Sequence, residues 1–296
     1  MILASNGIIA SQIASFDADA LAFFSRVTTA GGSLSTTEKS AVNQLVLDLK
    51  SYSIWTKMKA IYPMVGASAA ACAQNLVSSS FTGTFNGGWT YASTGVTPNG
   101  TNGYMDTGLN ASTQLSGTFA HASLYPRTSL SGGYGIQGDF SSRMDIFNFG
   151  NVLYSAIGTQ GQTNYTGTYA GLIVGSRINS TINKLYVGGI LRDTKSALST
   201  ANIQNLNYWL GACNNGYYSN NECAFASIGD GLTDTEASNF YTAVQTFNQS
   251  LSRQVGAQIV NDPDAQAFVN RVYNAGGTFA GPGSSFDWGN MWPVFG

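Results

Sequence analysis

Residues 143–158, RMDIFNFGNVLYSAIG, indicate the fold class of this chain. Two runs rich in Ile, Phe, Val, Leu and Tyr lie on either side of a Gly-Asn pair, and polar residues interrupt each run. Short alternating runs of this kind, separated by turn residues, are typical of antiparallel β-strands. Similar runs recur through the middle of the chain: GTFAHASLYPR (117–127), AGLIVGSR (170–177) and KLYVGGILRDT (184–194). The pattern predicts an antiparallel β-sandwich.

The predicted sandwich extends over residues 78–231. INSTINKLYVGG, residues 178–189, is predicted to contain a hairpin with its turn at Asn179-Ser180. CAFASIGD, residues 223–230, is predicted to be the last strand, because helical signals follow it.

Helix start and stop signals lie on both sides of these strands. Asp17 can cap a first helix, and Gly31-Gly32 can end it. STTE at 35–38 and TDTE at 233–236 are capping boxes, which predict helices at each of these points. SIWTKMKAIYP, residues 53–63, is predicted to add a short helical turn that stops at its proline. The predicted organisation is an N-terminal arm (1–16), a helical module (17–77), the sandwich (78–231), a packing helix (232–256) and a C-terminal segment (257–296).

The two ends of the chain carry a repeated sequence. DADALAFFSRVTTAGGSL (17–34) and DPDAQAFVNRVYNAGGTF (262–279) are identical at ten of eighteen positions. WTKMKAIYPMVG (55–66) and WGNMWPVFG (288–296) share W-x-x-M and a closing P-x-x-G, so the C-terminal segment is a partial repeat of the helical module. One helix with an aromatic tail cannot bury its apolar side chains alone. The N-terminal module, the segment's own domain or a neighbouring subunit must cover the predicted assembly residues Phe268, Val272, Trp288, Trp292 and Phe295.

Composition restricts the functions that this chain can have. Only 9% of the residues are charged and the net charge is −2, so no basic surface is predicted to bind nucleic acid. Fifteen Tyr, sixteen Phe and five Trp indicate a folded chain. No segment has the roughly 20 apolar residues of a membrane span. The first residues, MILASNGIIASQIAS, have no basic flank, so we expect no signal peptide and synthesis in a cytoplasm.

The three cysteines leave two interpretations open. Cys213 and Cys223 flank the loop NNGYYSNNE and could pair across a hairpin, or they are small buried apolar side chains like Cys72. An odd count at low density does not indicate a disulfide framework.

The chain lacks a recognisable catalytic set. Glu38 and Glu236 belong to the capping boxes, and Glu222 stands alone in an Asn-rich loop. No carboxylate pair suited to sugar hydrolysis is found on a strand, and the single histidine, His121, has no G-x-S-x-G serine motif to accompany it. The sequence therefore predicts a protein that is not an enzyme and needs no cofactor. Calcium has weak candidate ligands in Asp106, Asp139 and Asp145.

Glycan binding is the chemistry that the loops favour. An aromatic ring can lie beneath the apolar face of a pyranose while amide and carboxylate groups bind its hydroxyls. GGWTYASTGVTPNGTNGYMDTGL (87–109) and NNGYYSNNE (214–222) concentrate such residues. The alternative is that the aromatic residues are core and that Asn-Gly only makes turns. The predicted glycan-binding residues are Trp89, Tyr91, Asn99, Asn102, Tyr104, Asp106, Tyr217 and Tyr218.

Three stretches together resemble a known protein family: DLKSYSIWTKMKAIYPMVG (48–66), residues 87–109, and FASIGDGLTDTEASNFYTAVQTFNQSL (225–251). They are similar to virion structural proteins of tailed and other phages of Bacteroidetes hosts, over nearly the whole chain from Phe16 to about Val255. The resemblance implies a concanavalin A-like (laminin-G-like) sandwich of the jelly-roll class, with a lectin-like role in a spike, fibre or vertex appendage. It supplies no shared catalytic set. The shortened C-terminal repeat departs from the family's single helical-plus-sandwich unit and leaves open whether that end anchors the protein or meets another chain.

The combined prediction is a virion protein that is mainly β with flanking helices, namely an N-terminal helical module and a C-terminal helix. It is expected to assemble with copies of itself and with other virion proteins, as a trimer or around a fivefold vertex, and to bind host surface glycan. Two alternatives stay open. One is a secreted carbohydrate-active enzyme, and the other is a capsid or decoration protein that binds no ligand.

Overall fold

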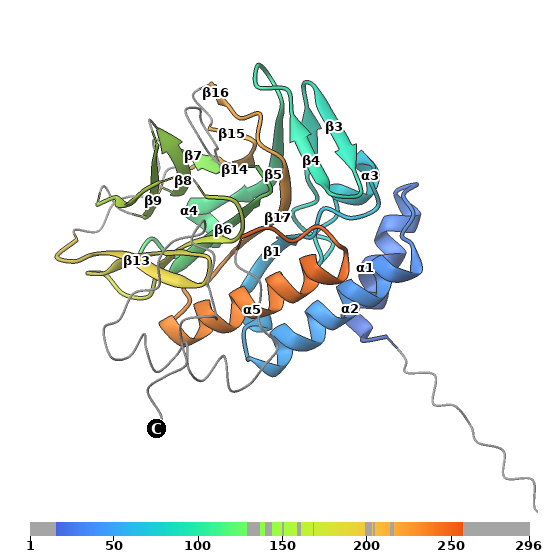
Figure 1. Cartoon of the computed structure of the whole chain (residues 1–296), viewed down its shortest axis with the longest axis horizontal. Helices are drawn as coiled ribbons and strands as arrows, with labels where there is room; N and C mark the ends of the chain where they lie inside the picture. The colour runs from blue at the N-terminus through green and yellow to red at the C-terminus, as the bar shows by residue number, and fades with distance from the viewer. Residues whose placement is uncertain are drawn as a thin grey trace, which may run out of the picture.

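Two facing β-sheets and a layer of helices make up the fold (Figure 1). The computed structural model describes residues 16–128, 137–139, 144–149, 151–158, 161–167, 169–198, 203, 205–213 and 216–256. All but one of the strand pairs are antiparallel, the exception being a short parallel pair. The predicted class, a mainly β sandwich with flanking helices, is therefore confirmed.

Sheet A has eight strands in the order β13-β12-β11-β6-β17-β4-β3, with β1 also paired to β17. Its strands are β1 (Met58–Tyr62), β3 (Trp89–Ala92), β4 (Gly95–Pro98), β6 (Ala120–Pro126), β11 (Ile173–Arg177), β12 (Asn183–Val187), β13 (Ile190–Lys195) and β17 (Cys223–Gly229). The predicted hairpin at Asn179-Ser180 is confirmed, because β11 and β12 are antiparallel neighbours and the Asn179 side chain accepts hydrogen bonds from the Thr181 and Ile182 amides.

Sheet B has nine strands, seven of them in the order β10-β9-β8-β7-β14-β5-β2. The opening stretch of the sequence analysis forms its β8–β9 hairpin, in which Phe149 pairs with Val152. The strands are β2 (Thr84–Asn86), β5 (Tyr104–Asn110), β7 (Gln137–Asp139), β8 (Met144–Phe149), β9 (Val152–Ile157), β10 (Thr163–Thr166), β14 (Asn207–Leu210), β15 (Ala212–Cys213) and β16 (Tyr217–Tyr218).

The helices begin where the sequence signals place them. The helices are α1 (Ala18–Thr29), α2 (Thr36–Ser51) and α5 (Asp234–Ser250), with short α3 (Ala69–Cys72) and α4 (Ala111–Gln114). Asp17 caps α1, and both predicted capping boxes are formed, at Ser35 with Glu38 and at Thr233 with Glu236. Gly31 follows α1 with φ +85°, a left-handed conformation that favours glycine.

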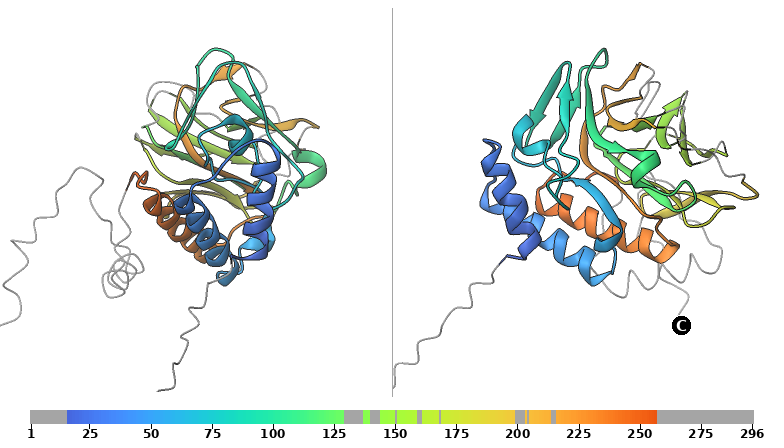
Figure 2. Two further views of the ribbon diagram at one scale, coloured as in Figure 1. Left: turned by 90° about the vertical axis from the view of Figure 1, so that its right-hand side faces the viewer. Right: turned by 180° about the vertical axis from the view of Figure 1, so that it is seen from behind.

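Sheet A has an apolar core on each of its two faces. Between the sheets lie side chains such as Met105, Ile146 and Ile228. On the other face of sheet A, Phe225 packs against Phe240 and against further side chains of α2 and α5, which lie side by side (Figure 2). The helices therefore cover sheet A.

Residues 58–62 differ from the prediction, because they form strand β1 rather than a helical turn. Only Trp55–Lys57 is helical, as a 3₁₀ turn. Tyr62 pairs with Ala226 of β17, and the strand is buried on both faces: Ala60 and Tyr62 face the core between the sheets, and Ile61 faces the helices. The predicted division at residues 77/78 therefore leaves one strand of sheet A inside the helical module.

Asn75 completes the open edge of β1. Its Oδ1 accepts hydrogen bonds from the Ile61 amide at 2.9 Å and the Val77 amide at 3.0 Å. Its Nδ2 donates to the carbonyls of Lys59 at 3.1 Å and Ser80 at 2.9 Å. Asn75 is fully buried, so it substitutes for a neighbouring strand.

We expect Asn75→Ala to lower the free energy of unfolding by about 2 kcal/mol, because buried backbone groups of β1 lose their partners. Urea denaturation measures the loss. Asn164→Ala, at an exposed position on β10, is the matched control and should stay within about 0.5 kcal/mol of wild type. Equal stability of the two variants would contradict the role of Asn75.

Two sets of predicted features lie outside the described residues. Residues 1–15 of the arm are one, and residues 257–296 are the other, with Phe268, Val272, Trp288, Trp292 and Phe295. Within the described part, Cys72, Cys213 and Cys223 are buried thiols that form no disulfide, so the alternative of a bond between Cys213 and Cys223 is not realised.

Candidate functional site

The single histidine lies in a buried polar network. His121 Nδ1 lies 2.6 Å from the Asp230 carbonyl oxygen, and Nε2 lies 3.0 Å from Ser227 Oγ. Ser227 Oγ is in turn 2.7 Å from Ser123 Oγ. His121, Ser123 and Ser227 are all fully buried between sheet A and α5. This Ser-His pair is oriented by a backbone carbonyl rather than a carboxylate and cannot reach a substrate, so it contributes to structure.

The three glutamates all have structural partners. Glu38 and Glu236 form their capping boxes, and Glu236 also pairs with Lys57 at 2.6 Å. Glu222 accepts hydrogen bonds from Thr94 Oγ1 at 2.5 Å and from Arg127 at 2.8 Å. Among the residues that the structure describes, none of them forms a matched acid and base with another carboxylate.

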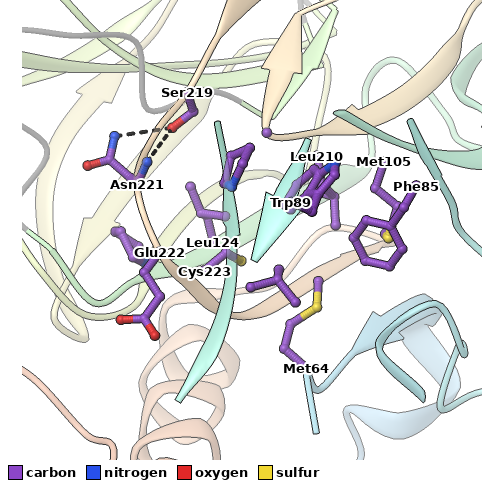
Figure 3. Close-up of a pocket in the computed structure, with 14 residues that line it drawn as sticks. Met64, Phe85, Trp89, Met105, Leu124, Leu210, Ser219, Asn221, Glu222 and Cys223 are labelled. Atoms are coloured by element: carbon purple, nitrogen blue, oxygen red, sulfur yellow. Dashed lines mark hydrogen bonds between the residues drawn. The ribbon is translucent and has the colours of Figure 1, made fainter. Parts of the chain in front are cut away.

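Trp89 and Tyr91 of the predicted glycan set face the sandwich core. The Phe85 ring packs edge-on against both, at 4.9 Å from Trp89 and 5.1 Å from Tyr91. Trp89 donates its indole N–H to the Asn86 carbonyl and forms one wall of a small cavity, together with Met105 and Leu210 (Figure 3). The cavity has about 20 Å³ of free volume, which holds about one water molecule. The structure therefore fits the core interpretation for these two rings.

Asn99 and Asn102 build the turn between β4 and β5. Asn99 Oδ1 accepts hydrogen bonds from the amides of Thr101, Asn102 and Gly103, and its Nδ2 donates to Asn102 Oδ1 at 2.7 Å. Asn102 Oδ1 also accepts from the Gly88 amide. These contacts fit the turn interpretation, since the oxygens that could bind a sugar already hold the loop.

Tyr104 and Asp106 lie on the outer face of sheet B, where they meet two residues of β14. Tyr104 stacks on Trp209 with ring centroids 3.8 Å apart and planes 18° from parallel. Trp209 pairs across the strands with Asp106, and Asn207 Nδ2 lies 3.3 Å from Asp106 Oδ2. We call Tyr104, Asp106, Asn207 and Trp209 the aromatic face. Its two rings are half-buried, and each has one side that the other ring does not cover.

Tyr217 and Tyr218 lie on the short β15–β16 hairpin of sheet B. Tyr217 is 38% exposed and pairs with Cys213. Cys213 packs with Phe147 and Tyr154, whose rings stack at 5.0 Å. The structure therefore brings Tyr104 and Asp106 together, while the other six predicted residues fall in the core edge, the β4–β5 turn and this hairpin.

Trp209 and Asn207 were missed by the sequence analysis. The signal was available in residues 207–210, NYWL, where Tyr208 and Leu210 are buried and Asn207 and Trp209 are half-exposed. This alternation marks a strand with one face to the core and one face outward. The strand was overlooked because only four residues carry the pattern.

The three calcium candidates lie on three strands of sheet B. Asp106 is on β5, whereas Asp139 and Asp145 are on β7 and β8. Asp145 is fully buried and accepts a hydrogen bond from the Ala156 amide. Among the residues whose placement is described, no three His, Cys, Asp or Glu side chains gather as a metal site would require.

Comparison with known proteins finds similar solved structures only. No family model and no curated protein matches the chain. Domain 4 of AbnA, a GH43 extracellular arabinanase from Geobacillus stearothermophilus solved with arabinotriose, is 13% identical with a TM-score of 0.45; the match covers 62% of this chain and 98% of that domain. The binding domain of botulinum neurotoxin serotype D is 10% identical, with a TM-score of 0.44 and 64% and 52% covered. The binding domain of Paraclostridial Mosquitocidal Protein 1 is 12% identical, with a TM-score of 0.46 and 65% and 53% covered. The chain spans about half the length of the two toxin domains.

The described helices were also compared with the length and hydropathy that a membrane span requires. None of them meets both requirements.

Proposed function

We propose that this protein is a non-catalytic virion component that binds host surface glycan through the aromatic face. The observation that carries the proposal is the Tyr104–Trp209 stack on a sheet face that α1, α2 and α5 leave free, since these helices cover sheet A (Figure 2). Half-exposed aromatic rings with polar groups beside them form a surface on which a ligand can stack. The virion assignment rests on the family resemblance of the sequence.

The geometry of the aromatic face suits a sugar better than a wholly apolar ligand. The C–H face of a pyranose can lie on the uncovered side of either ring, while Asp106 and Asn207 present an acceptor and a donor beside the stack. Asp106 is already held in place, because its Oδ1 accepts the Gly108 amide at 2.8 Å. A pre-oriented carboxylate loses little conformational entropy on binding.

The enzyme alternative has less support from the described residues. A glycosidase needs two carboxyl groups about 5–9 Å apart around the scissile bond. On the aromatic face Asp106 is the single carboxylate, and the glutamates are committed elsewhere as caps and ion pairs. Binding without hydrolysis is therefore the proposal, with a ligand-free capsid or decoration protein as the outcome if no glycan binds.

Substitution of Trp209 tests the proposal directly. We expect the wild-type chain to bind a subset of glycans on an array of host surface polysaccharides, and Trp209→Ala to weaken that binding by about tenfold or more, because one ring of the platform is lost. Trp209→Phe keeps a ring and should recover most of the affinity. Thermal unfolding of each variant separates lost binding from lost folding.

Phe119→Ala is the matched control for this test. Phe119 is 37% exposed, precedes β6 of sheet A, and lies beneath the Lys57 ammonium at 5.7 Å. Its removal deletes an aromatic ring of similar exposure away from the aromatic face and should leave glycan binding unchanged. The glycan proposal would be wrong if the wild-type chain bound no glycan on the array, or if Trp209→Ala and Phe119→Ala lost glycan binding equally.

A further inference from the structure

Helix α1 is held to the rest of the chain by a small set of contacts. Asp17 and Asp19 both pair with Lys50 of α2 at 2.7 Å, and the Asp17 amide donates to Asn43 Oδ1 at 2.7 Å. Arg26 donates to the backbone carbonyls of Asn75 at 2.9 Å and Leu76 at 3.1 Å. We call Asn43, Lys50 and these two carbonyls, with the apolar side chains of α2 beside them, the α1 seat.

The apolar side of α1 completes the attachment. Ala20, Phe23 and Val27 are fully buried, and Phe24 is 8% exposed. Gly32 follows the helix at a point where an added Cβ would lie 3.0 Å from the Ala71 side chain, so the chain passes close to α3 there. Anything that replaced α1 on its seat would need two acids, this apolar set, the arginine and the glycine.

The repeated sequence near the C-terminus keeps all of these features. Asp17, Asp19 and Arg26 correspond to Asp262, Asp264 and Arg271. The buried positions stay apolar, with three identical residues and one Phe changed to Val, and Gly32 corresponds to Gly277. By contrast five of the six exposed residues of α1 change and Ala22 is kept. The changed residues, Ala18, Leu21, Ser25, Thr28 and Thr29, correspond to Pro263, Gln266, Asn270, Tyr273 and Asn274.

This division between kept and changed positions is the decisive observation. Capping alone could explain the first acid, because Asp17 also caps α1. Capping does not explain why the second acid and the arginine are kept at the spacing that fits Lys50 and the carbonyls of residues 75 and 76. Within the described residues the chain offers one α1 seat, and α1 occupies it. The chain therefore carries two sequences for one seat.

We propose that residues 262–279 of one copy of this chain occupy the α1 seat of a second copy, displacing its α1. The exchange replaces most contacts of α1 by equivalent ones, with Val269 in place of the Phe24 ring, so its free-energy cost is small, as in domain swapping. Within a single copy α1 has the advantage, because residues 30–35 join it directly to α2 and give it a high effective concentration.

The proposed exchange has a defined geometry. The donor segment and the seat are different surfaces, so each copy gives its C-terminal segment to the next and the contact is head-to-tail. Such contacts close into rings when the rotation between copies permits it. Each exchange also releases α1 with the residues that precede it. This inference deepens the assembly role that the sequence predicts for a virion component and does not depend on the glycan role, since the aromatic face is on the other sheet.

Zero-length cross-linking of the unmodified chain tests the exchange. Equal amounts of ¹⁵N-labelled and unlabelled full-length protein are mixed, allowed to exchange, and treated with a carbodiimide, which joins a carboxylate and an ammonium group only when they are in contact. Peptide mass spectrometry should find Lys50 joined to Asp17 or Asp19 within one isotope. It should also find Lys50 joined to Asp262 or Asp264 between one labelled and one unlabelled peptide.

Two substitutions in the donor segment, residues 262–279, test the proposal further and leave the residues of the α1 seat unchanged. Arg271→Glu should reduce the mixed-isotope link by about tenfold or more, because its carboxylate would face the seat's carbonyls. Tyr273 corresponds to Thr28 of α1, which is exposed. Tyr273→Thr introduces the same residue as α1 has there and should leave the link unchanged. Native mass spectrometry should show that the Arg271→Glu variant loses the oligomer and the Tyr273→Thr variant keeps it.

Three results would overturn the proposal. One is a Lys50–Asp264 link found only within a single isotope, which would place the segment on its own chain's seat. Another is an oligomer that forms without this link. The third is an Arg271→Glu variant that assembles and cross-links like wild type. None of these results bears on whether Trp209 binds glycan, so the two proposals can fail separately.

Discussion

Arg253→Met is expected to lower the free energy of unfolding by about 4 kcal/mol, because the substitution leaves several buried oxygens without a donor. Arg253 is 1% exposed and lies just beyond α5. Its guanidinium donates to the carbonyls of Pro63 at 2.6 Å, Met64 at 2.7 Å and Ala224 at 2.9 Å, and to Asn248 Oδ1 at 2.9 Å. One side chain thus connects α5, the segment after β1, and β17.

The charge of Arg253 is retained despite its burial. Burial lowers its pKa from the usual value to about 10, so the guanidinium remains protonated at neutral pH. Methionine fills a similar volume and tests the loss of hydrogen bonds rather than the loss of packing. Urea denaturation at pH 7 gives the free energy of unfolding, and a loss of heat stability should accompany it.

Two companion variants complete the Arg253 experiment. Arg253→Lys keeps a charge but has a single donor nitrogen, so it should be nearly as destabilised as the methionine variant. Arg192→Met removes an exposed arginine that lies over the Tyr165 ring at 5.1 Å, and should cost less than about 1 kcal/mol. If Arg253→Met were as stable as Arg192→Met, the hydrogen bonds from Arg253 to the backbone carbonyls would not be what holds α5, β17 and the segment after β1 together.

The features that sequence predicted well are those set by neighbouring residues. A capping box needs two side chains three positions apart, and both boxes, at Ser35 and Thr233, form as predicted. The β8–β9 hairpin follows from its own alternation and turn. These signals fixed the helix starts and the sandwich class without any knowledge of tertiary contacts.

The features that sequence missed depend on distant partners. Strand β1 exists because β17, more than 160 residues later, pairs with it and Asn75 covers its other edge. Arg253 binds backbone carbonyls, which every residue has, so no sequence motif can predict these contacts. In the same way, Trp89 and Tyr104 occur in one stretch of sequence with similar surroundings, and the pairing of strands alone decides that Trp89 faces the core and Tyr104 faces outward.

His121 should make the protein lose about 3 kcal/mol of stability as the pH falls from 7 to 4. Burial lowers the pKa of His121 to about 4, below its value of about 6.5 in an unfolded chain. Between these two pH values the unfolded state binds a proton at this histidine and the folded state does not, so the free energy of unfolding falls as the pH falls. The stabilisation is complete above pH 6.5 and is lost by about pH 4.

The hydrogen bonds of the His121 ring explain why it stays unprotonated in the folded state. The Asp230 carbonyl can only accept, so Nδ1 carries the hydrogen and Nε2 accepts from Ser227. Protonation of Nε2 would turn it into a donor, force the Ser227 and Ser123 hydroxyls to reorient, and leave a charge in a fully buried site. Lys57 and Glu236 form an ion pair, and their effects on the His121 pKa oppose each other: Lys57 lowers it and Glu236 raises it.

Measurement of the free energy of unfolding from pH 7.5 to 4.5 tests this assignment, because the chain has no other histidine. The hydrogen bond from Lys50 lowers the pKa of Asp17, so that carboxylate contributes stability that disappears only at lower pH, below its unfolded pKa of about 4. His121→Gln keeps a neutral hydrogen-bonding side chain and should be less stable at pH 7, but it should show a much flatter dependence between pH 6.5 and 4.5. Two results would show that burial does not keep the imidazole neutral: a wild-type stability that is constant across that interval, or a glutamine variant with the same slope as wild type. A buried histidine that stays neutral must leave the folded state with fewer bound protons than the unfolded state at these pH values.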